Sequence, residues 1–211
     1  ETAKENLIRE GIDTNSIFVT GNTVIDALFM ILSKNPPAFK GLDETKRLIL
    51  VTLHRRENWD KLGGILDALI ELARTFPDIQ ILFPVHPNPN VNALAKTKLE
   101  GKEGFLLTDP MDYITFIATC KKAALIISDS GGIQEEAPSL KVPVLVVREF
   151  TERPEALHAG VSKLVGTEKE NIFSLARSLL ADEAARQKMI KEISPFGDGH
   201  AAKRIIDIIS K

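Results

Sequence analysis

Short apolar runs alternate with amphipathic stretches along the whole chain of 211 residues. The apolar runs are nearly continuous, with little alternation of apolar and polar positions, which is typical of parallel strands covered on both faces. We predict seven such strands, at 16–21, 47–54, 79–86, 104–109, 124–129, 142–147 and 162–167. The regular succession of strand and helix predicts an α/β fold, a Rossmann-like doubly wound parallel sheet.

The stretches between the runs have helical periodicity. The clearest is 61–76, where Leu62, Ile65, Leu66 and Leu69 recur at the spacing of one helix face. Similar patterns predict helices at 22–34, 90–100 and 112–123, and a short one at 132–140. Residues 1–11 also read as a helix, and the chain enters it directly from a Glu rather than a Met, so we expect a piece of a longer protein.

The end of the chain predicts a separate unit. A Pro-Phe-Gly-Asp-Gly break at 195–199 precedes a last amphipathic helix. We therefore predict a Rossmann-like domain at 1–194 and a terminal helix at 195–211 that packs somewhere other than on this sheet.

Composition narrows the environment and the partners. The net charge is −2, from 27 basic and 29 acidic residues, which does not favour a nucleic-acid partner. No apolar stretch approaches the roughly 20 residues that span a bilayer, and no signal-peptide pattern is present. Cys120, in an apolar run, is the single cysteine, so we predict a reduced, buried thiol in a cytoplasmic protein.

Polar motifs follow five of the predicted strands. In doubly wound sheets, ligands bind outside the carboxyl ends of the strands, so these loops are the candidate site. The motifs are HRREN (54–58), HPNPN (86–90), DPMDY (109–113), SGGIQEE (130–136) and REFTERPE (148–155).

Two adjacent glycines open the predicted short helix. Ser130, Gly131 and Gly132 lie where backbone N–H groups lack partners within the helix, and glycines without Cβ atoms let a phosphate approach those amides. Ser130 does not complete a capping box, because Ile133 stands three residues on. Glu136, or Glu135 beside it, would accept hydrogen bonds from ribose hydroxyls. The alternative is a tight turn whose glutamates only complement the helix dipole.

HRREN and TERPE place charged groups at strand ends. His54 is a candidate acid, base or phosphate ligand. Arg55 and Arg56 either clamp phosphates or pair with Glu57, and we expect one of the two to form that ion pair. Arg153 is either half of a structural ion pair or a phosphate clamp.

The other histidines indicate no chemistry by themselves. His86 is expected to be a hydrogen-bonded structural residue, and His158 and His200 have no supporting motif. No close pair of histidines accompanies the one cysteine, so we predict no metal site. Without a GxGxxG or Walker motif we predict no dinucleotide cofactor. The residues alone predict an α/β domain that binds a phosphorylated, nucleotide-like ligand.

Six motifs together resemble one family, the non-hydrolysing UDP-N-acetylglucosamine 2-epimerases. They are VTGNTVIDAL (19–28), LVTLHRREN (50–58), FPVHPNPNV (83–91), SDSGGIQEEAPSL (128–140), TERPEALHAG (151–160) and PFGDGHAAKRI (195–205). They are similar to the C-terminal half of that family, in order and from end to end of the chain.

The resemblance implies an activity for the full-length protein. Members have two Rossmann-like domains in a GT-B arrangement, bind UDP mainly through the C-terminal one and need no cofactor. They eliminate UDP from UDP-GlcNAc to give a 2-acetamidoglucal and add it back to give UDP-ManNAc, an isomerase activity that serves cell-surface polysaccharide biosynthesis. They are usually homodimers.

The resemblance also implies roles for individual residues. Ser130, Gly131 and Gly132 would bind the diphosphate, and Glu136 the ribose. His54 and Arg153 would lie at the phosphates or the reacting sugar, with His54 as the catalytic candidate. Phe116 and Met111 would flank the uracil, although Met111 offers no side-chain amide. His86 and Arg56 would belong to a second, allosteric UDP-GlcNAc site.

The acidic catalytic residues of the family and a GTRPE-like loop belong to the N-terminal domain, which this sequence does not contain. We therefore expect this chain to bind UDP weakly and not to epimerise alone, and its last helix to cross back to that domain in the intact enzyme. Two alternatives stay open at this point: a nucleotide-sugar-binding domain of a GT-B glycosyltransferase, and a non-catalytic partner-binding module.

Overall fold

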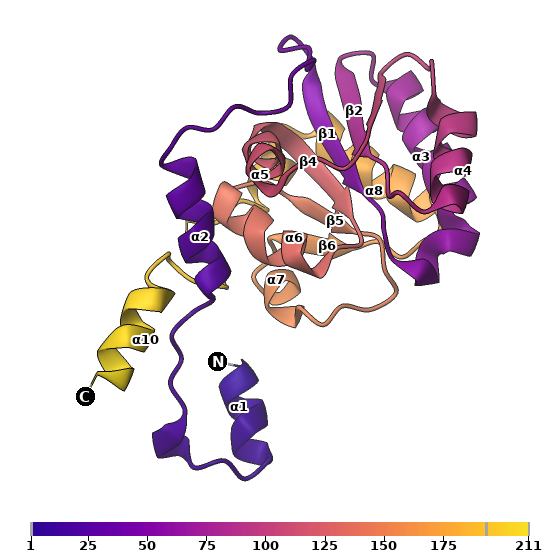
Figure 1. The fold of residues 1–211 in the computed structure, drawn as a ribbon. Coiled ribbons are helices and arrows are strands. Elements are labelled where there is room, and N and C mark those ends of the chain that lie inside the picture. Colours follow the sequence, from indigo (N-terminus) through magenta and orange to yellow (C-terminus); the bar gives the residue numbers. More distant parts are fainter. Residues whose placement is uncertain (1, 193, 211) are drawn as a thin grey trace.

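A six-stranded, fully parallel sheet forms the centre of the computed structural model, which describes residues 2–192 and 194–210 (Figure 1). Three residues lie outside the described ones: Glu1, Ile193 and Lys211. Glu1 belongs to the predicted first helix, Ile193 is next to the predicted domain boundary, and Lys211 belongs to the predicted terminal helix. The strand order is β3-β2-β1-β4-β5-β6. The strands are Arg47–Thr52 (β1), Ile79–Pro84 (β2), Phe105–Thr108 (β3), Ala123–Ser128 (β4), Val144–Val146 (β5) and Ser162–Leu164 (β6). The predicted Rossmann-like α/β fold is confirmed.

One predicted strand, at 16–21, is wrong. A 3-10 turn, Thr14–Ser16 (η1), ends there, and the following residues are outside the sheet and pair with no strand among the described residues. Phe18 and Val19 are 58% and 52% exposed. An apolar run predicts burial, but this run lies beside the terminal helix, away from the sheet.

The helices connect the strands. Those that match a prediction are α1 (Thr2–Arg9), α2 (Thr23–Leu32), α3 (Leu62–Thr75), α4 (Pro89–Leu99), α5 (Tyr113–Lys122), α6 (Gly131–Glu136) with η3 (Ala137–Leu140), and α10 (Ala201–Ile209). Elements without a specific prediction are η2 (Arg56–Lys61), α7 (Pro154–His158), α8 (Lys169–Ala181) and α9 (Glu183–Gln187).

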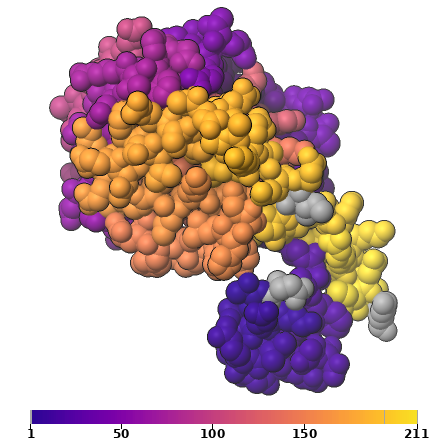
Figure 2. Space-filling view, turned by 180° about the vertical axis from the view of Figure 1, so that it is seen from behind, coloured from indigo at the N-terminus to yellow at the C-terminus, as the bar shows by residue number. Residues whose placement is uncertain are grey.

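The sheet is covered on both faces, as the continuous apolar runs predict. One hydrophobic cluster joins Ile49, Val51 and Ile127 to α3, α4 and α8. Another joins Leu50 and Ile126, from alternate positions of the same strands, to α2, α5 and α6. Figure 2 shows the first of these faces, where α8 forms a broad part of the surface. The helices packed on the two faces of the sheet thereby fix the positions of the strands and of their carboxyl ends.

The two ends of the chain form a lobe beside the sheet domain, made of residues 2–20 and α10 (Figures 1 and 2). The lobe joins the domain at α2, where both carboxylate oxygens of Asp26 accept backbone N–H groups of Ala201 and Ala202, at 3.1 and 2.9 Å. Gly199 has φ +82°, and a Cβ there would lie 2.4 Å from the Phe29 ring, so this junction requires glycine. The terminal helix does pack away from the sheet, and the proposed boundary after residue 194 stays a prediction.

Two further predictions concern the environment of the chain. Across 2–192 and 194–210, every helix is too short or too polar to cross a lipid bilayer. Cys120 is buried and unpaired, as predicted, and burial raises the pKa of its thiol.

Candidate functional site

The candidate site lies where the strand order reverses, at the carboxyl ends of β1 and β4. These strands are neighbours and pair in parallel register from Leu48 and Ala123 to Thr52 and Ser128. The hydroxyls of Thr52 and Ser128 are 2.6 Å apart at the last pair. The loops HRREN and SDSGG therefore leave the sheet side by side, in the crevice where such folds bind ligands.

Asp129 holds these two loops together. Its carboxylate is fully buried and accepts the backbone N–H of His54 at 3.1 Å and of Arg55 at 3.0 Å. It also accepts the side-chain amide of Asn58 at 3.0 Å, and that amide donates to the Val147 carbonyl as well. The imidazole Nε2 of His54 lies 3.6 Å from the same carboxylate. One buried anion thus fixes where His54 stands above the sheet.

The first turn of α6 leaves its N–H groups open to a ligand. Ser130 is the N-cap residue, but its hydroxyl makes no capping hydrogen bond, as its sequence context predicts. Gly131 and Gly132 have ordinary negative φ. A Cβ on Gly131 would come no closer than 3.9 Å to Arg55, and one on Gly132 no closer than 3.8 Å to the Ser130 hydroxyl. The fold itself therefore does not require glycine at either position.

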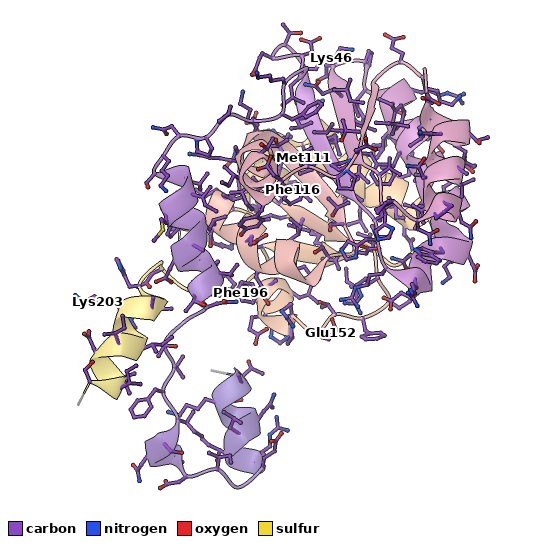
Figure 3. All side chains as sticks on the ribbon, viewed as in Figure 1. Lys46, Met111, Phe116, Glu152, Phe196 and Lys203 are labelled. Carbon is purple, nitrogen blue, oxygen red and sulfur yellow. The ribbon has the colours of Figure 1, made fainter. Side chains whose placement is uncertain are left out.

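A pocket of roughly 360 Å³ opens beside this turn. It brings together six of the predicted site residues: His54, Met111, Phe116, Ser130, Gly132 and Glu136. Thr52, Pro84, Pro110, Tyr113 and Ile133 complete its lining. Figure 3 labels Met111 and Phe116, which lie close together at the start of α5. The pocket thus has an apolar wall on one side and the helix N-terminus and His54 on the other.

Glu136 is the acidic group of this pocket and is only 6% exposed. Its carboxylate accepts a hydrogen bond from the Tyr113 hydroxyl at 2.5 Å. Burial raises the pKa of Glu136, against a smaller lowering by that hydrogen bond. Burial, followed by the neighbouring carboxylate, raises the pKa of Tyr113 too, so the hydroxyl stays a donor.

Arg153 does not line the pocket in this structure. Its Nε donates to Glu135, and its Nη1 donates to the Glu152 carbonyl at 3.1 Å. Glu135 also accepts the side-chain amide of Asn22, the N-cap of α2, at 2.7 Å. Of the two predicted alternatives for Arg153, the structure therefore shows the ion pair.

The expected partner of Glu57 is wrong. Neither Arg55 nor Arg56 pairs with it; Arg148, from the end of the β5 run, donates to it at 3.0 Å. Arg55 instead donates to the Asp129 carbonyl at 3.1 Å. Arg56 points elsewhere, with its guanidinium 5.9 Å from the centre of the Trp59 ring. Glu57 thus pairs with an arginine that the fold brings close to it rather than with a neighbour in the sequence.

The other three histidines lie outside the pocket lining. His86 lies outside the pocket lining, and its Nδ1 accepts the backbone N–H of Asn88 at 3.1 Å, a structural hydrogen bond as expected. His158 is the last residue of α7, and His200 occupies the N-cap position of α10 without a capping side-chain hydrogen bond. Among the described residues, no group of three or more His, Cys, Asp or Glu side chains is placed to hold a metal ion.

Three residues that organise the site, Asp129, Tyr113 and Arg148, have no role among the predictions from the sequence. Asp129 stands directly before the glycine motif, and its place after a buried strand was a usable signal. Tyr113 was within a predicted loop but without a role. Arg148 was the first residue of another such loop, yet nothing in the sequence indicates that it is buried.

Comparisons with known proteins agree over nearly the whole chain. A family described as UDP-N-acetylglucosamine 2-epimerase matches residues 1–210. A UDP-N-acetylglucosamine 2-epimerase of Yersinia pestis is 47% identical over 219 aligned residues, covering 98% of this chain. A crystal structure of the Neisseria meningitidis UDP-GlcNAc 2-epimerase bound to UDP-GlcNAc is 40% identical over 99% of this chain, with a TM-score of 0.93. A Listeria monocytogenes structure titled as a putative member is 43% identical over the full chain, with a TM-score of 0.90.

The chain spans only part of these relatives. It covers 58% of the length of the Yersinia protein, 59% of the Neisseria chain and 57% of the Listeria chain. The matched part contains the whole parallel sheet and all the site loops described above.

Proposed function

The chain belongs to the UDP-N-acetylglucosamine 2-epimerase family, and from this premise we propose that it is the UDP-binding, C-terminal half of such an enzyme. The full-length protein would interconvert UDP-GlcNAc and UDP-ManNAc by eliminating UDP and adding it back. The Neisseria relative, solved with UDP-GlcNAc bound, supports the ligand class. Family membership favours this reading over a GT-B glycosyltransferase.

One observation carries the proposal: two adjacent glycines begin α6, although no neighbouring atom of the protein excludes a Cβ at either position. Glycine costs about 0.5–1 kcal/mol relative to alanine inside a helix, so a pair needs a reason. An anion that approaches the backbone where Cβ atoms would stand supplies it. The pocket and the imidazole beside the same turn fit a nucleotide diphosphate.

The geometry suggests how UDP would lie. Its diphosphate would accept the N–H groups of Gly131 and Gly132 and the hydroxyl of Ser130, whose own N–H donates to the Ser128 hydroxyl at 2.9 Å. Its ribose hydroxyls would donate to Glu136. The uracil would pack between Phe116 and Met111 on the apolar side of the pocket. Glu136 already accepts one hydroxyl, that of Tyr113, so it is oriented for a second.

Two cationic or titratable groups would act at the phosphates. Arg153 would exchange Glu135 for a phosphate, which is a stronger hydrogen-bonding partner for a guanidinium fork. His54, fixed by Asp129, would stand where the bond between the sugar and UDP breaks and re-forms, to stabilise or protonate the departing phosphate oxygen. The acidic groups that take and return the sugar proton would come from the other half, so this chain alone would not epimerise.

The terminal lobe would meet that other half. Ile12, Phe18, Ile206 and Ile209 in the lobe are exposed hydrophobic residues. The lobe is formed by both ends of the chain, and the chain covers 58% of the length of the Yersinia relative. We propose that α10 crosses back to the N-terminal domain there. A homodimer of the intact enzyme, a cytoplasmic location and an allosteric UDP-GlcNAc site at His86 and Arg56 belong to the same proposal.

Calorimetric titration with UDP and with uridine tests the proposal. We expect saturable UDP binding and weaker uridine binding, because uridine lacks the diphosphate. Arg153→Ala should weaken UDP binding about tenfold or more, the value of one charge-assisted hydrogen bond, and leave uridine unaffected. Arg177→Ala is the matched control, because Arg177 is an exposed arginine of α8 and has no place in the pocket.

Two outcomes count against the proposal. A folded chain that binds no UDP at millimolar concentration would exclude the UDP site. Equal affinities for UDP and uridine would remove the proposed role of the helix N-terminus in binding the diphosphate.

A further inference from the structure

Arg148 is a buried cation that joins two loops of the site. Its side chain is 1% exposed, and its guanidinium lies 5.2 Å from the centre of the Phe150 ring. Nε donates to Glu57 at 3.0 Å, while Nη1 and Nη2 donate to the two carboxylate oxygens of Glu152 at 2.6 and 3.0 Å. Each nitrogen of the guanidinium thus meets a carboxylate.

The two carboxylates come from the loops that carry the proposed anion-binding groups. Glu57 follows His54 and Arg55 in the loop after β1. Glu152 directly precedes Arg153. Arg148 therefore connects both sides of the proposed diphosphate site through side chains rather than through the sheet.

Stability alone is a weak explanation for this arrangement. Burying a guanidinium has a desolvation cost, and apolar residues of similar volume often replace buried ion pairs without loss of stability. The carboxylates do not need burial, since the side chains of Glu57 and Glu152 are 47% and 49% exposed. The position of Arg148 between Glu57 and Glu152 indicates that it controls where these two carboxylates lie.

Glu152 would otherwise compete for the arginines of the site. Its carboxylate already lies 3.9 Å from the Nη2 of Arg55. The Arg148 hydrogen bonds are the main cause that holds the pKa of Glu152 at about 2, so it is an anion at any working pH. Without Arg148, that anion would be free to capture Arg55 or Arg153 and would add a negative charge beside the diphosphate.

We propose that Arg148 is a positioning residue: by engaging Glu57 and both oxygens of Glu152, it keeps the Glu152 carboxylate from capturing Arg55 and Arg153. Arg55, and Arg153 once it exchanges Glu135 for a phosphate, can then reach the diphosphate of UDP. This inference rests on the proposed function of the chain. Arg148 acts through its neighbours and does not itself touch the ligand.

A charge-rescue experiment tests the inference by UDP and uridine titration of four chains: wild type, Arg148→Met, Glu152→Gln and the double variant. Arg148→Met should weaken UDP binding about tenfold or more, equivalent to one charge-assisted hydrogen bond, with uridine binding unchanged. Glu152→Gln alone should leave UDP binding unchanged or tighter. The double variant should recover most of the loss, because the competing anion has been neutralised.

Arg47→Met is a matched control at the opposite end of the sheet, where Figure 3 labels the adjacent Lys46. Arg47 also donates to a carboxylate, Asp78 at 2.7 Å, and lies over a ring, Phe76 at 5.6 Å. Its loss should leave both affinities unchanged. If Arg148→Met does not give a folded circular-dichroism spectrum, Arg148→Lys replaces it. Because one ammonium cannot engage both carboxylates as a guanidinium does, Arg148→Lys should give a smaller loss of UDP affinity, which Glu152→Gln again reverses.

The outcomes separate the two claims. A wild-type chain that binds no UDP overturns the proposed function. A wild-type chain that binds UDP while the Arg148 variants bind it equally well overturns this inference alone. A loss that affects UDP and uridine equally and that Glu152→Gln does not restore assigns Arg148 a purely structural role, which also overturns it.

Discussion

Gly132→Ala adds one methyl group at the mouth of the pocket, and the structure predicts opposite effects on stability and binding. The nearest neighbouring atom to that methyl is the Ser130 hydroxyl oxygen at 3.8 Å, an ordinary contact. Gly132 has negative φ within α6, so alanine fits its backbone. Alanine should therefore stabilise the empty chain by about 0.5–1 kcal/mol. For a domain of this size that corresponds to a rise of roughly 1–4 °C in Tm.

Binding should change in the other direction. The same methyl occupies the space through which the diphosphate would reach the backbone N–H groups. Losing one hydrogen bond to a charged group costs about 1.5–3 kcal/mol, so UDP affinity should fall roughly 10- to 100-fold. Uridine, which has no diphosphate, should bind as before.

The assay is thermal unfolding by circular dichroism together with calorimetric titration of UDP and uridine. Gly64→Ala is the matched control, because Gly64 also lies in the first turn of a helix, α3, where an added Cβ would meet no atom within 4 Å, and it has no place in the pocket. It should raise Tm similarly and leave binding unchanged. A Gly132→Ala chain that is destabilised, or that binds UDP as tightly as wild type, would refute the reasoning.

Two further predictions concern the carboxylates of the site. Burial raises the folded-state pKa of Glu136, so its contribution to stability is full below its unfolded value of about 4.5 and is lost as pH rises through the folded pKa. Glu136→Gln should therefore be more stable than wild type at pH 7, with a difference in stability that vanishes in acid, and it should bind UDP more weakly. Urea titrations at several pH values measure the stability of both chains, and a constant difference across these pH values would contradict this. Asp129→Ala leaves the donors of the loop after β1 without their acceptor, so the free energy of unfolding should fall by at least about 2 kcal/mol. Asp182→Ala, which removes an exposed N-cap of α9, should cost only about 1 kcal/mol, and equal losses for the two variants would be inconsistent with this account.

The sequence predicts those parts of the fold that depend on local pattern. Continuous apolar runs indicate parallel strands because burial on both faces removes alternation, and six of these runs are strands. The run at 16–21 has the same composition, but whether it is buried depends on what it packs against, and in this chain it lies in the terminal lobe. The α8 helix carries an apolar face typical of its layer, with Ile172, Ala176, Leu179 and Leu180 buried, and could have been predicted from its periodicity.

The position of the candidate site could be predicted from the sequence, but the ion pairs within it could not. Loops at the carboxyl ends of strands follow from the sheet order, and so does the meeting of His54 with Ser130. Ion-pair partners do not, because they depend on distances between loops far apart in sequence. Glu57 pairs with Arg148, 91 residues away, and Glu135 rather than either flanking glutamate holds Arg153. Local charge patterns predict that an arginine will be paired, but only the three-dimensional structure identifies its partner.

We propose that the N–H groups of Gly131 and Gly132 bind the diphosphate of UDP. Amide ¹H–¹⁵N spectra of the chain, recorded during titration with UDP and then with uridine, test it most directly. We expect large, saturable shifts of the Gly131 and Gly132 signals with UDP, smaller shifts with uridine, and none for Gly63 and Gly64 in α3. Binding of UDP that leaves the Gly131 and Gly132 signals in place would contradict it.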